Sequence, residues 1–379
     1  MKYSFPAAKL PDNQEQLRAK VRGFLDEQRR NGSFSPVTSG WITYDADFSL
    51  ACGRAGFIGI TWPEKYGGGG RAPIERYIVL EELLAAGAPV GAHWIADRQS
   101  GPQIIRHGTE RLRAELLPRI VRGELCFAIG MSEPNSGSDL ASISSRAEKV
   151  EGGWRLNGRK IWTTNGHRAH YLIGLFRTQP RSDARHEGMS QFVIDMSADG
   201  VSRRPIRDMC DGEDFAEITF DDVFVSDDYL LGQPGDGWKL VTAELAFERS
   251  GAERFLSVFP LFERALHHPE LFDSATYDFG RLIAHLAVLR QLSLSVAVRL
   301  ADGGNSLALE AALVKDMGNA HEQEVPEVLR RRLRIMPEID GGEMASMLAK
   351  TILSAPSFTL RGGTPEVLKG MLAKGLGLR

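Results

Sequence analysis

Apolar residues recur three and four positions apart in the first third of the chain. The pattern is clearest over residues 17–30 (LRAKVRGFLDEQRR), 75–87 (ERYIVLEELLAAG) and 110–124 (ERLRAELLPRIVRGE). This spacing places apolar side chains on one face of a helix, so it predicts three amphipathic helices. A glycine-rich stretch from Trp62 to Pro73 lies between the first two and lacks the GK[ST] ending of a phosphate-binding loop. We expect a helix-to-helix connection there.

Near Cys126 the pattern changes to short runs in which apolar and polar residues alternate. Runs such as GGWRLNGRKIWTT, HYLIGLFRT and AEITFDDVFV are separated by Gly, Asn, Asp and Pro up to about Gly232, which is typical of strands. From Asp236 helical spacing returns, first as one long pattern over residues 237–266. The order predicts an α+β fold with a helical domain at 1–125, a β domain at 126–233 and a second helical domain at 234–379.

Composition narrows the class of protein. The chain of 379 residues is 42% apolar and 25% charged, as globular proteins are. Its 46 Lys and Arg against 49 Asp and Glu give a net charge of −3, so no overall positive field favours nucleic acid or an anionic membrane. Cys52, Cys126 and Cys210 show no CxxC spacing, which argues against disulfides and a zinc site. Without a signal-peptide core or a long apolar run, we expect a cytoplasmic protein that does not insert into membranes.

Two segments of the β region carry candidate chemistry. In the first, residues 127–142, hydroxyls and backbone N–H groups cluster around Ser132 and Ser138. Such a cluster suits an anionic or hydrogen-bonding cofactor, and it suits a structural turn equally well. In the second, residues 156–173, strand alternation predicts Trp162 and Thr164 on one face and Thr163 on the other. A Trp beside two threonines is more often packed strand than ligand site, but the two segments together favour a site.

The pair resembles the two central signatures of the acyl-CoA dehydrogenase family. The first signature, A-x-x-x-[ST]-E-P-x-x-G-S-D, stands at residues 128–139, and the second, G-x-K-x-W-[IT]-T-N-[GA], stands at residues 158–166. Similar pieces include WPEKYGG near the N-terminus and GGTPEVLKGMLAKGLGL at the C-terminus. The resemblance implies a helical N-terminal domain, a β-barrel-like middle domain and a C-terminal four-helix bundle. It also implies FAD as the cofactor and an acyl-CoA as the substrate.

The family's cofactor contacts carry over to matching positions in three parts of the chain. By resemblance, Ile129, Met131 and Ser132 lie along the flavin ring, and Ser138 lies between the flavin and the phosphates of CoA. Trp162 flanks the ring, with Thr163 and Thr164 beside it; a π-rich wall and a few hydrogen bonds orient a flavin. The C-terminal loop adds Gly363, Thr364 and Glu366, where Thr364 is a predicted helix N-cap followed by Pro365.

The catalytic base is expected on the first long helix of the C-terminal domain. In many relatives a Glu precedes the Gly-Thr of the C-terminal loop, but Gly362 stands there in this chain. Isovaleryl-CoA dehydrogenases and related enzymes place the base on the earlier helix, which matches Glu248, followed by Arg249 as a substrate contact or a holder of charge. On one continuous helix, Glu248 would share its face with Leu245, Gly251 and Phe255. The alternative is a surface glutamate paired with a neighbouring cation.

Two further features bear on the substrate and on the assembly. Arg98, with Trp94 and Asp97, stands where relatives have apolar acyl-pocket residues, which predicts a polar or carboxylated acyl chain; an exposed pair between Arg98 and Asp97 is the alternative. The family has an arginine and a glutamine that reach the FAD of a neighbouring subunit. In this chain the arginine is missing four residues before Gly280, and the glutamine is missing from the segment DGGEMA at residues 340–345. This resembles steroid-side-chain dehydrogenases that form mixed tetramers, so we expect a homo-oligomer or a heterotetramer with a paralogous chain.

The resulting hypothesis is FAD-dependent α,β-dehydrogenation of an acyl-CoA in fatty acid or sterol side-chain catabolism. Glu248 abstracts the α-proton, the flavin accepts the β-hydride, and an electron-transfer flavoprotein is the expected acceptor. One alternative is a non-catalytic or FAD-poor subunit of a heterotetramer. Another is an acyl-CoA oxidase or a flavin monooxygenase, which differs in how its reduced flavin reacts with oxygen.

Overall fold

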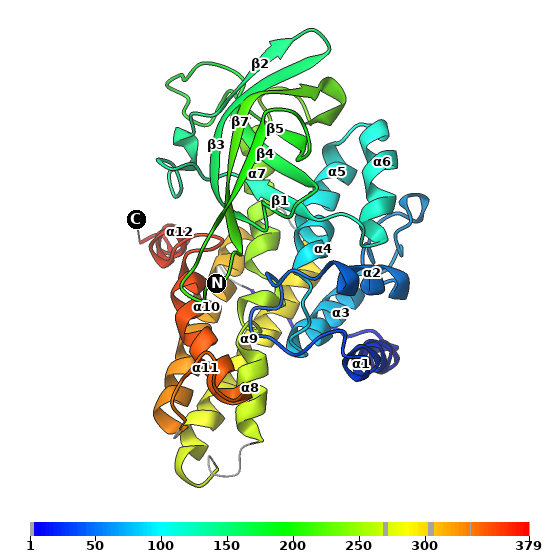
Figure 1. The fold of residues 1–379 in the computed structure, drawn as a ribbon. Coiled ribbons are helices and arrows are strands. Elements are labelled where there is room, and N and C mark those ends of the chain that lie inside the picture. Colours follow the sequence, from blue (N-terminus) through cyan, green and yellow to red (C-terminus); the bar gives the residue numbers. More distant parts are fainter. Residues whose placement is uncertain (1–3, 268–271, 302–306, 334, 379) are drawn as a thin grey trace. The chain divides into compact units, whose positions relative to one another are not determined.

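The computed structural model describes residues 4–267, 272–301, 307–333 and 335–378, apart from the side chains of residues 244–248, 272–275 and 301. The chain forms two compact units, each made of separate stretches of sequence. The helical unit consists of Met1–Trp41, Ala72–Pro89 and Leu245–Arg379, and the sheet unit consists of Ile42–Arg71 and Val90–Glu244. The predicted order of helices, strands and helices is confirmed, and the fold is mixed α+β (Figure 1).

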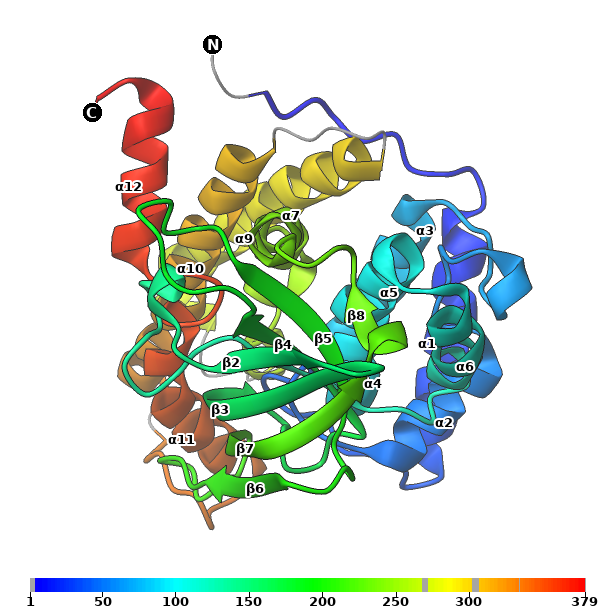
Figure 2. The same cartoon turned by 90° about the horizontal axis from the view of Figure 1, so that it is seen from above.

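One eight-stranded sheet dominates the sheet unit. Its strands are β1 (Phe127–Gly130), β2 (Arg146–Val150), β3 (Gly153–Thr164), β4 (Tyr171–Arg177), β5 (Met189–Asp195), β6 (Val201–Ile206), β7 (Phe215–Ser226) and β8 (Leu230–Leu231). They lie in the order β6-β7-β3-β2-β4-β5-β8, and β1 pairs in parallel with β4. Figure 2 shows β6, β7, β3 and β2 side by side. The antiparallel pairs β3–β7 and β4–β5 hold the register of this sheet.

Aromatic side chains fill the core beneath the sheet. The apolar run of β4 is buried along its whole length. Phe176 on this strand meets Phe192 and Phe220 edge-on, with ring centroids 6.2 and 5.2 Å apart. Trp154 packs edge-on against Phe192 at 5.5 Å. Burying each of these rings stabilises the fold by roughly 1.5–3 kcal/mol, so the core holds the neighbouring strands in place.

Short helices complete the sheet unit. They are α2 (Ala46–Ala55), η1 (Glu64–Tyr66), α4 (Gly91–Ile95), the π-helical turn η2 (Ala96–Ser100), α5 (Gly101–His107), α6 (Glu110–Val121), η3 (Leu140–Ser142) and η4 (Asp227–Tyr229). Asp45 begins α2 by accepting a 2.8 Å hydrogen bond from the Phe48 N–H, as N-cap residues do. A Cβ atom at Gly101 would lie 2.1 Å from the ring of Trp62, so only glycine allows α5 to pack this closely.

The helical unit contains the longest helices among the described residues and several short ones. They are α1 (Gln14–Arg30), α3 (Pro73–Ala85), η5 (Ala252–Arg254), α8 (Phe259–Leu266), α9 (Phe272–Ala301), α10 (Ala308–Arg332), α11 (Glu343–Ser354), η7 (Ala355–Thr359) and α12 (Pro365–Leu376). A charged cluster joins three of them: Arg18 of α1 and Arg290 of α9 both pair with Glu81 of α3, at 2.8 and 2.6 Å. One described stretch, Thr276–Leu300 of α9, passes a length and composition test for crossing a membrane, a test that core helices of soluble proteins also pass.

The helical pattern over residues 237–266 is interrupted, contrary to the prediction. α7 (Gly237–Arg249) ends at Arg249, the turn η5 follows, and α8 begins at Phe259. Gly251 has an extended backbone with φ −76° and ψ 165°, which no helix continues through. Gly251 and Phe255 therefore do not share a helical face with Glu248, and that part of the argument for an apolar setting around Glu248 is wrong.

Candidate active site

The first predicted flavin segment runs from β1 into a tight turn. β1 places Ile129 opposite Ile173 of β4. Beyond the strand, the backbones of Glu133 and Ser136 exchange hydrogen bonds of 2.7 and 3.0 Å. Ile129, together with Met131 and Ser132, is half-buried, and Ser138 is exposed. The turn therefore leaves these predicted contacts accessible on the sheet unit.

The second segment presents its Trp on a bulge in β3. The register between β3 and β7 shifts between Lys160 and Thr163. At the bulge Trp162 has φ 58°, a left-handed conformation that costs a non-glycine residue of order 1–3 kcal/mol. The ring of Trp162 is 59% exposed and meets Phe215 edge-on at 6.3 Å, whereas Thr163 is buried. The exposed Trp162 and the buried Thr163 differ as the predicted alternation expects, although the bulge interrupts the regular period of the strand, and a wide aromatic surface is exposed.

The structure brings the two segments together. The Ile161 N–H donates to the Ser132 carbonyl oxygen at 2.9 Å. Lys160 Nζ pairs with a Glu133 carboxylate oxygen at 2.8 Å and donates to the Met131 carbonyl oxygen at 3.3 Å. Met131 and Ser132 therefore accept hydrogen bonds from the two residues that precede Trp162 in β3. These bonds join distant parts of the sequence, since Glu133 and Lys160 are 27 positions apart.

Lys160 and Glu133 form a buried ion pair. Their side chains are 0% and 5% exposed, and Glu133 also accepts from the N–H groups of Ser144 and Ser145 at 2.7 and 3.0 Å. Burial alone would raise the pKa of Glu133, but the charge and hydrogen bond of Lys160 hold it at about 2. Burial lowers the pKa of Lys160 to about 8, and the Glu133 charge opposes that change. Both groups are charged at neutral pH, so the pair ties the two segments electrostatically.

Asn165 anchors the end of the Trp162 segment. Its Nδ2 donates to the Ile42 carbonyl oxygen at 2.8 Å, and its Oδ1 accepts from Arg168 at 3.1 Å. Its backbone N–H donates to the Asp214 carbonyl oxygen at 2.8 Å, while its own φ is 51°. Asn tolerates this left-handed conformation better than most residues, which explains why the strand turns here rather than extending.

Arg98 lies in the π-helical turn η2 and is buried. Its guanidinium carbon lies 5.5 Å from the centroid of the Trp94 ring. Asp97 is also buried and accepts a 2.7 Å hydrogen bond from the Gly59 N–H. The alternative of an exposed pair between Arg98 and Asp97 is therefore wrong, because neither side chain is on the surface. π-Helical turns often occur at functional sites.

In the helical unit, the end of α7 is tied to the C-terminal glycine loop. Arg249 is buried, and its Nε donates to the Gly362 carbonyl oxygen at 2.9 Å. Its Nη1 also contacts the sulfur of Met371 on α12 at 3.3 Å. Gly362 and Gly363 have φ 66° and 105°, so the loop has a shape that favours glycine at both positions. Arg249 thus joins the end of α7 to the glycine loop and to α12.

The remaining predicted residues lie around the same loop. Thr364 caps α12 by accepting from the Val367 N–H at 3.5 Å, with Pro365 at the first helical position, which confirms the predicted helix start. Glu366 is exposed, and its own backbone N–H and the Thr364 hydroxyl lower its pKa. Glu248 is the penultimate residue of α7, but its side chain lies outside the described residues. Its catalytic role therefore stays a prediction.

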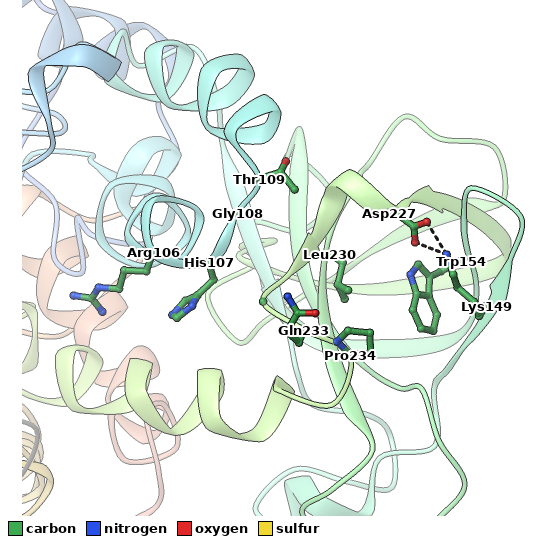
Figure 3. Close-up of a pocket in the computed structure, with 11 residues that line it drawn as sticks. Arg106, His107, Gly108, Thr109, Lys149, Trp154, Asp227, Leu230, Gln233 and Pro234 are labelled. Atoms are coloured by element: carbon green, nitrogen blue, oxygen red, sulfur yellow. Dashed lines mark hydrogen bonds and ion pairs between the residues drawn. The ribbon is translucent and has the colours of Figure 1, made fainter.

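The sheet unit also contains a cavity of about 650 Å³ at another place (Figure 3). Its walls come from residues 106–109, from residues 230 and 232–234, and from Lys149, Trp154 and Asp227. An ion pair between Lys149 and Asp227 closes one side (Figure 3). None of the predicted site residues lines this cavity, so its size alone does not make it the active site.

Sequence reasoning missed the ion pair and the anchor at Asn165. Glu133 and Lys160 each stand inside one of the two signatures. Each signature also holds a second group of the same sign, Asp139 and Arg159, so the sequence alone does not show which acid pairs with which base. Asn165 precedes a glycine, and an NG dipeptide by itself predicts only a turn.

Comparison with known proteins places the chain in a family. Residues 11–124 match the model for the acyl-CoA dehydrogenase N-terminal domain, and residues 128–223 match the model for the middle domain. Acyl-CoA dehydrogenase FadE26 of Mycobacterium tuberculosis is 30% identical over 96% of this chain and 97% of its own length. The chain belongs to the acyl-CoA dehydrogenase family. The predicted enzyme class, an oxidoreductase acting on the CH–CH bond of an acyl-CoA, is confirmed by this membership, and the family is one of flavoproteins.

Two further acyl-CoA dehydrogenases show the range of the likeness. FadE34 of Mycobacterium tuberculosis is 33% identical over 86% of this chain, which spans 45% of the length of FadE34. The structure of the Tcur3481-Tcur3483 steroid ACAD, which is named for two proteins, superposes with a TM-score of 0.85 at 27% identity. That comparison covers 98% of both chains, so the whole fold is shared.

Proposed function

We propose that the chain catalyses FAD-dependent α,β-dehydrogenation of an acyl-CoA thioester. The observation that supports this most is the junction of the two signature segments, where Ile161 bonds to Ser132 and Lys160 pairs with Glu133. The junction sets the exposed ring of Trp162 close to the accessible Met131 and Ser132. A flat aromatic wall beside backbone and hydroxyl hydrogen-bonding groups suits a flavin ring.

The residues present fit FAD. An exposed Trp162 in a strained left-handed conformation indicates that the ring is held out for a ligand. Ile129, Met131 and Ser132 would contact the flavin ring, with the backbone and hydroxyl of Thr164 and the neighbouring Thr163 beside it. Bound FAD supplies an acceptor for the β-hydride of the substrate. Gly363, Thr364 and Glu366 would hold the cofactor at the start of α12, where free N–H groups receive anions.

Glu248 is the proposed base that removes the α-proton. It lies in the last turn of α7, where the negative end of the helix dipole favours the protonated carboxyl and so raises its basicity. Gly362 cannot take a proton, and Arg249 next to Glu248 holds the Gly362 carbonyl at 2.9 Å. We therefore assign Arg249 a positioning role in addition to the predicted substrate contact, while Ser138 and Gly363 would contact CoA.

The substrate and the partners follow from two further observations. A buried Arg98 stacked on Trp94 supports an acyl chain that bears a carboxylate or another polar group. α9 carries exposed apolar residues: Tyr277 and Val288 are 82% and 48% exposed and share one helical face because they lie eleven positions apart, and Ile283, 47% exposed, lies about a third of a turn away. Apolar faces of this kind mark protein interfaces, so we propose a homo-oligomer or a heterotetramer with a paralogous chain. An electron-transfer flavoprotein is the proposed acceptor, and the cytoplasm the proposed compartment.

The domain limits 1–125, 126–233 and 234–379 also remain a proposal.

A second candidate function, a non-catalytic subunit of such a heterotetramer, is favoured by the exposed face of α9 and by the two missing FAD-contacting residues. It predicts a chain that assembles with a partner and contributes no base.

The test is an absorbance spectrum of the protein purified alone and titrated with FAD. We expect a flavin spectrum that is bleached anaerobically by at least one member of a panel of straight, branched, steroidal and carboxylated acyl-CoA thioesters. A protein that stays colourless after FAD addition would contradict the homomeric enzyme. Reduced flavin that reoxidises in air within seconds would favour an oxidase instead.

A further inference from the structure

One face of α10 carries polar groups that the proposed chemistry does not use. Lys315, Asn319 and Glu322 are spaced four and three residues apart, so they share one face of the helix. All three are 2% exposed or less. Fully buried Lys and Glu are rare because taking a charge out of water is costly unless it is paired. These two lie seven positions apart on α10, and each also bonds to a residue outside the helix.

Both charges bind the same short segment, which ends at the glycine loop. Lys315 Nζ donates to the Phe358 carbonyl oxygen at 2.9 Å and to Asn319. Glu322 pairs with the guanidinium of Arg361 at 2.7 Å. The segment from Phe358 to Arg361 leads directly into Gly362, so α10 holds the chain at two points just before the loop.

Arg361 is fixed by more than its charge. Its guanidinium carbon lies 4.8 Å from the ring centroid of Phe358 and 4.7 Å from that of Trp41. Its Nη2 also donates to the Ser257 hydroxyl at 3.1 Å. Glu322 in turn accepts from the Ser257 N–H at 3.3 Å. A planar guanidinium held between rings and bonded to two acceptors has little freedom to rotate.

The loop is thereby held from two sides. Arg361 and Lys315 fix the chain before Gly362, and Arg249 holds the Gly362 carbonyl from the end of α7. Gly362 and Gly363, with φ 66° and 105°, have no side chains of their own to pack. The shape of the loop is therefore set by these neighbours.

We propose that Lys315, Glu322 and Arg361 are positioning residues that fix the glycine loop, residues 362–364, in the shape that receives FAD. Replacing a buried ion pair by apolar residues is often neutral or stabilising, so stability alone does not explain three such groups around one loop. The cofactor part of this inference rests on the proposed function, whereas the control of loop shape by α10 does not.

The test separates loop position from overall stability. Amide hydrogen exchange would be measured by mass spectrometry on the flavin-free full chain, following Leu360, Val367 and Leu368, whose N–H groups are bonded at the two ends of the loop. The variants are Glu322→Leu, the double variant Glu322→Leu/Arg361→Leu and Lys315→Met. Glu327→Gln is the control, because Glu327 forms an exposed pair with Arg330 on the same helix.

We expect the double variant to recover the unfolding midpoint that Glu322→Leu loses, while these amides exchange about tenfold faster than in the wild type. The FAD dissociation constant of the same variant should rise by about tenfold, and the control should match the wild type in both. Arg361→Lys keeps the charge opposite Glu322 and replaces the double variant in this test if the double variant does not fold. In Arg361→Lys the same amides should exchange severalfold faster than in the wild type.

If the loop amides of a folded double variant, or of Arg361→Lys, exchange at the wild-type rate, the proposal is overturned. The three charged residues would then contribute only to packing of the core. If the wild-type chain binds no FAD, the proposed function fails, and the exchange data still decide whether α10 controls the loop.

Discussion

Replacing Lys160 by Met tests whether the buried ion pair holds the candidate flavin site together. Lys160 and Glu133 are 0% and 5% exposed and 2.8 Å apart. Met keeps most of the side-chain volume but leaves the Glu133 carboxylate buried without its cation. Removing one partner of a buried pair costs about 3–5 kcal/mol. At roughly 2–4 °C per kcal/mol for a unit of this size, the unfolding midpoint of Lys160→Met should fall by about 6–20 °C.

The matched control is Lys149→Met on the neighbouring strand β2. Lys149 also pairs with a carboxylate, that of Asp227, but both side chains are 52% exposed, so the loss should be about 1 kcal/mol or less. Adding Glu133→Gln to Lys160→Met removes the unpaired charge and keeps an acceptor for the Ser144 and Ser145 N–H groups. This double variant should regain most of the lost stability.

The pH dependence of the protein's stability tests the same ion pair independently. The Lys160 ammonium holds the folded-state pKa of Glu133 at about 2, below the ordinary value of 4.5 for a glutamate, so the stability that Glu133 contributes is present above about pH 4.5 and is lost as the pH falls toward 2. Over this range the unfolding midpoint of the wild type should fall more steeply in thermal melts than that of Glu133→Gln, which keeps only the acid dependence of other carboxylates with a lowered pKa, such as Glu82. An equal effect of Lys160→Met and Lys149→Met, with an unchanged acid limb in Glu133→Gln, would refute the reasoning.

Three further outcomes are expected. Trp162→Ala should raise the FAD dissociation constant by about tenfold because the flavin loses its aromatic wall, whereas Phe224→Ala, an exposed ring on the same sheet, should not; equal effects would make Trp162 a surface residue only. Arg98→Ala should lower kcat/KM for carboxylated acyl-CoAs by about tenfold or more relative to straight saturated ones, and an unchanged ranking would contradict the polar-substrate proposal. Val288→Glu on α9 should dissociate the assembly in light-scattering measurements of mass, while Val150→Glu, an exposed apolar residue of β2, should not; an unchanged mass would remove this face of α9 from the interface.

Much of the architecture was predictable because it follows from local periodicity. The run YLIGLFR and the alternation around Trp162 predict strands, and strands are found at β4 and β3. The cap at Thr364 followed likewise from local chemistry, since Thr-Pro at a helix start satisfies the first N–H groups. The interruption after Arg249 was missed because apolar spacing continues through Ser250 and Gly251, and only the backbone conformation of Gly251 shows the break.

The site itself depended on long-range register, which periodicity does not contain. The pairing of Lys160 with Glu133 requires the turn after β1 to meet the bulge in β3, and nothing local to either segment predicts that meeting. The burial of Arg98 depends on a π-helical turn, a rare element without a reliable sequence signal. Arg361 was overlooked for a related reason, because its partner Glu322 lies 39 residues away on α10.

The proposed removal of the α-proton of an acyl-CoA by Glu248 is tested directly by the rate of flavin bleaching. FAD-loaded Glu248→Gln is mixed rapidly and anaerobically with an acyl-CoA that reduces the wild type. Glu244→Gln, one turn earlier on α7, is the control. Gln keeps the shape of Glu but not its basicity, so we expect unchanged thioester binding and a rate lower by roughly 10²-fold or more, with Glu244→Gln near the wild type. A Glu248→Gln variant that reduces its flavin at the wild-type rate would mean that Glu248 is not the base.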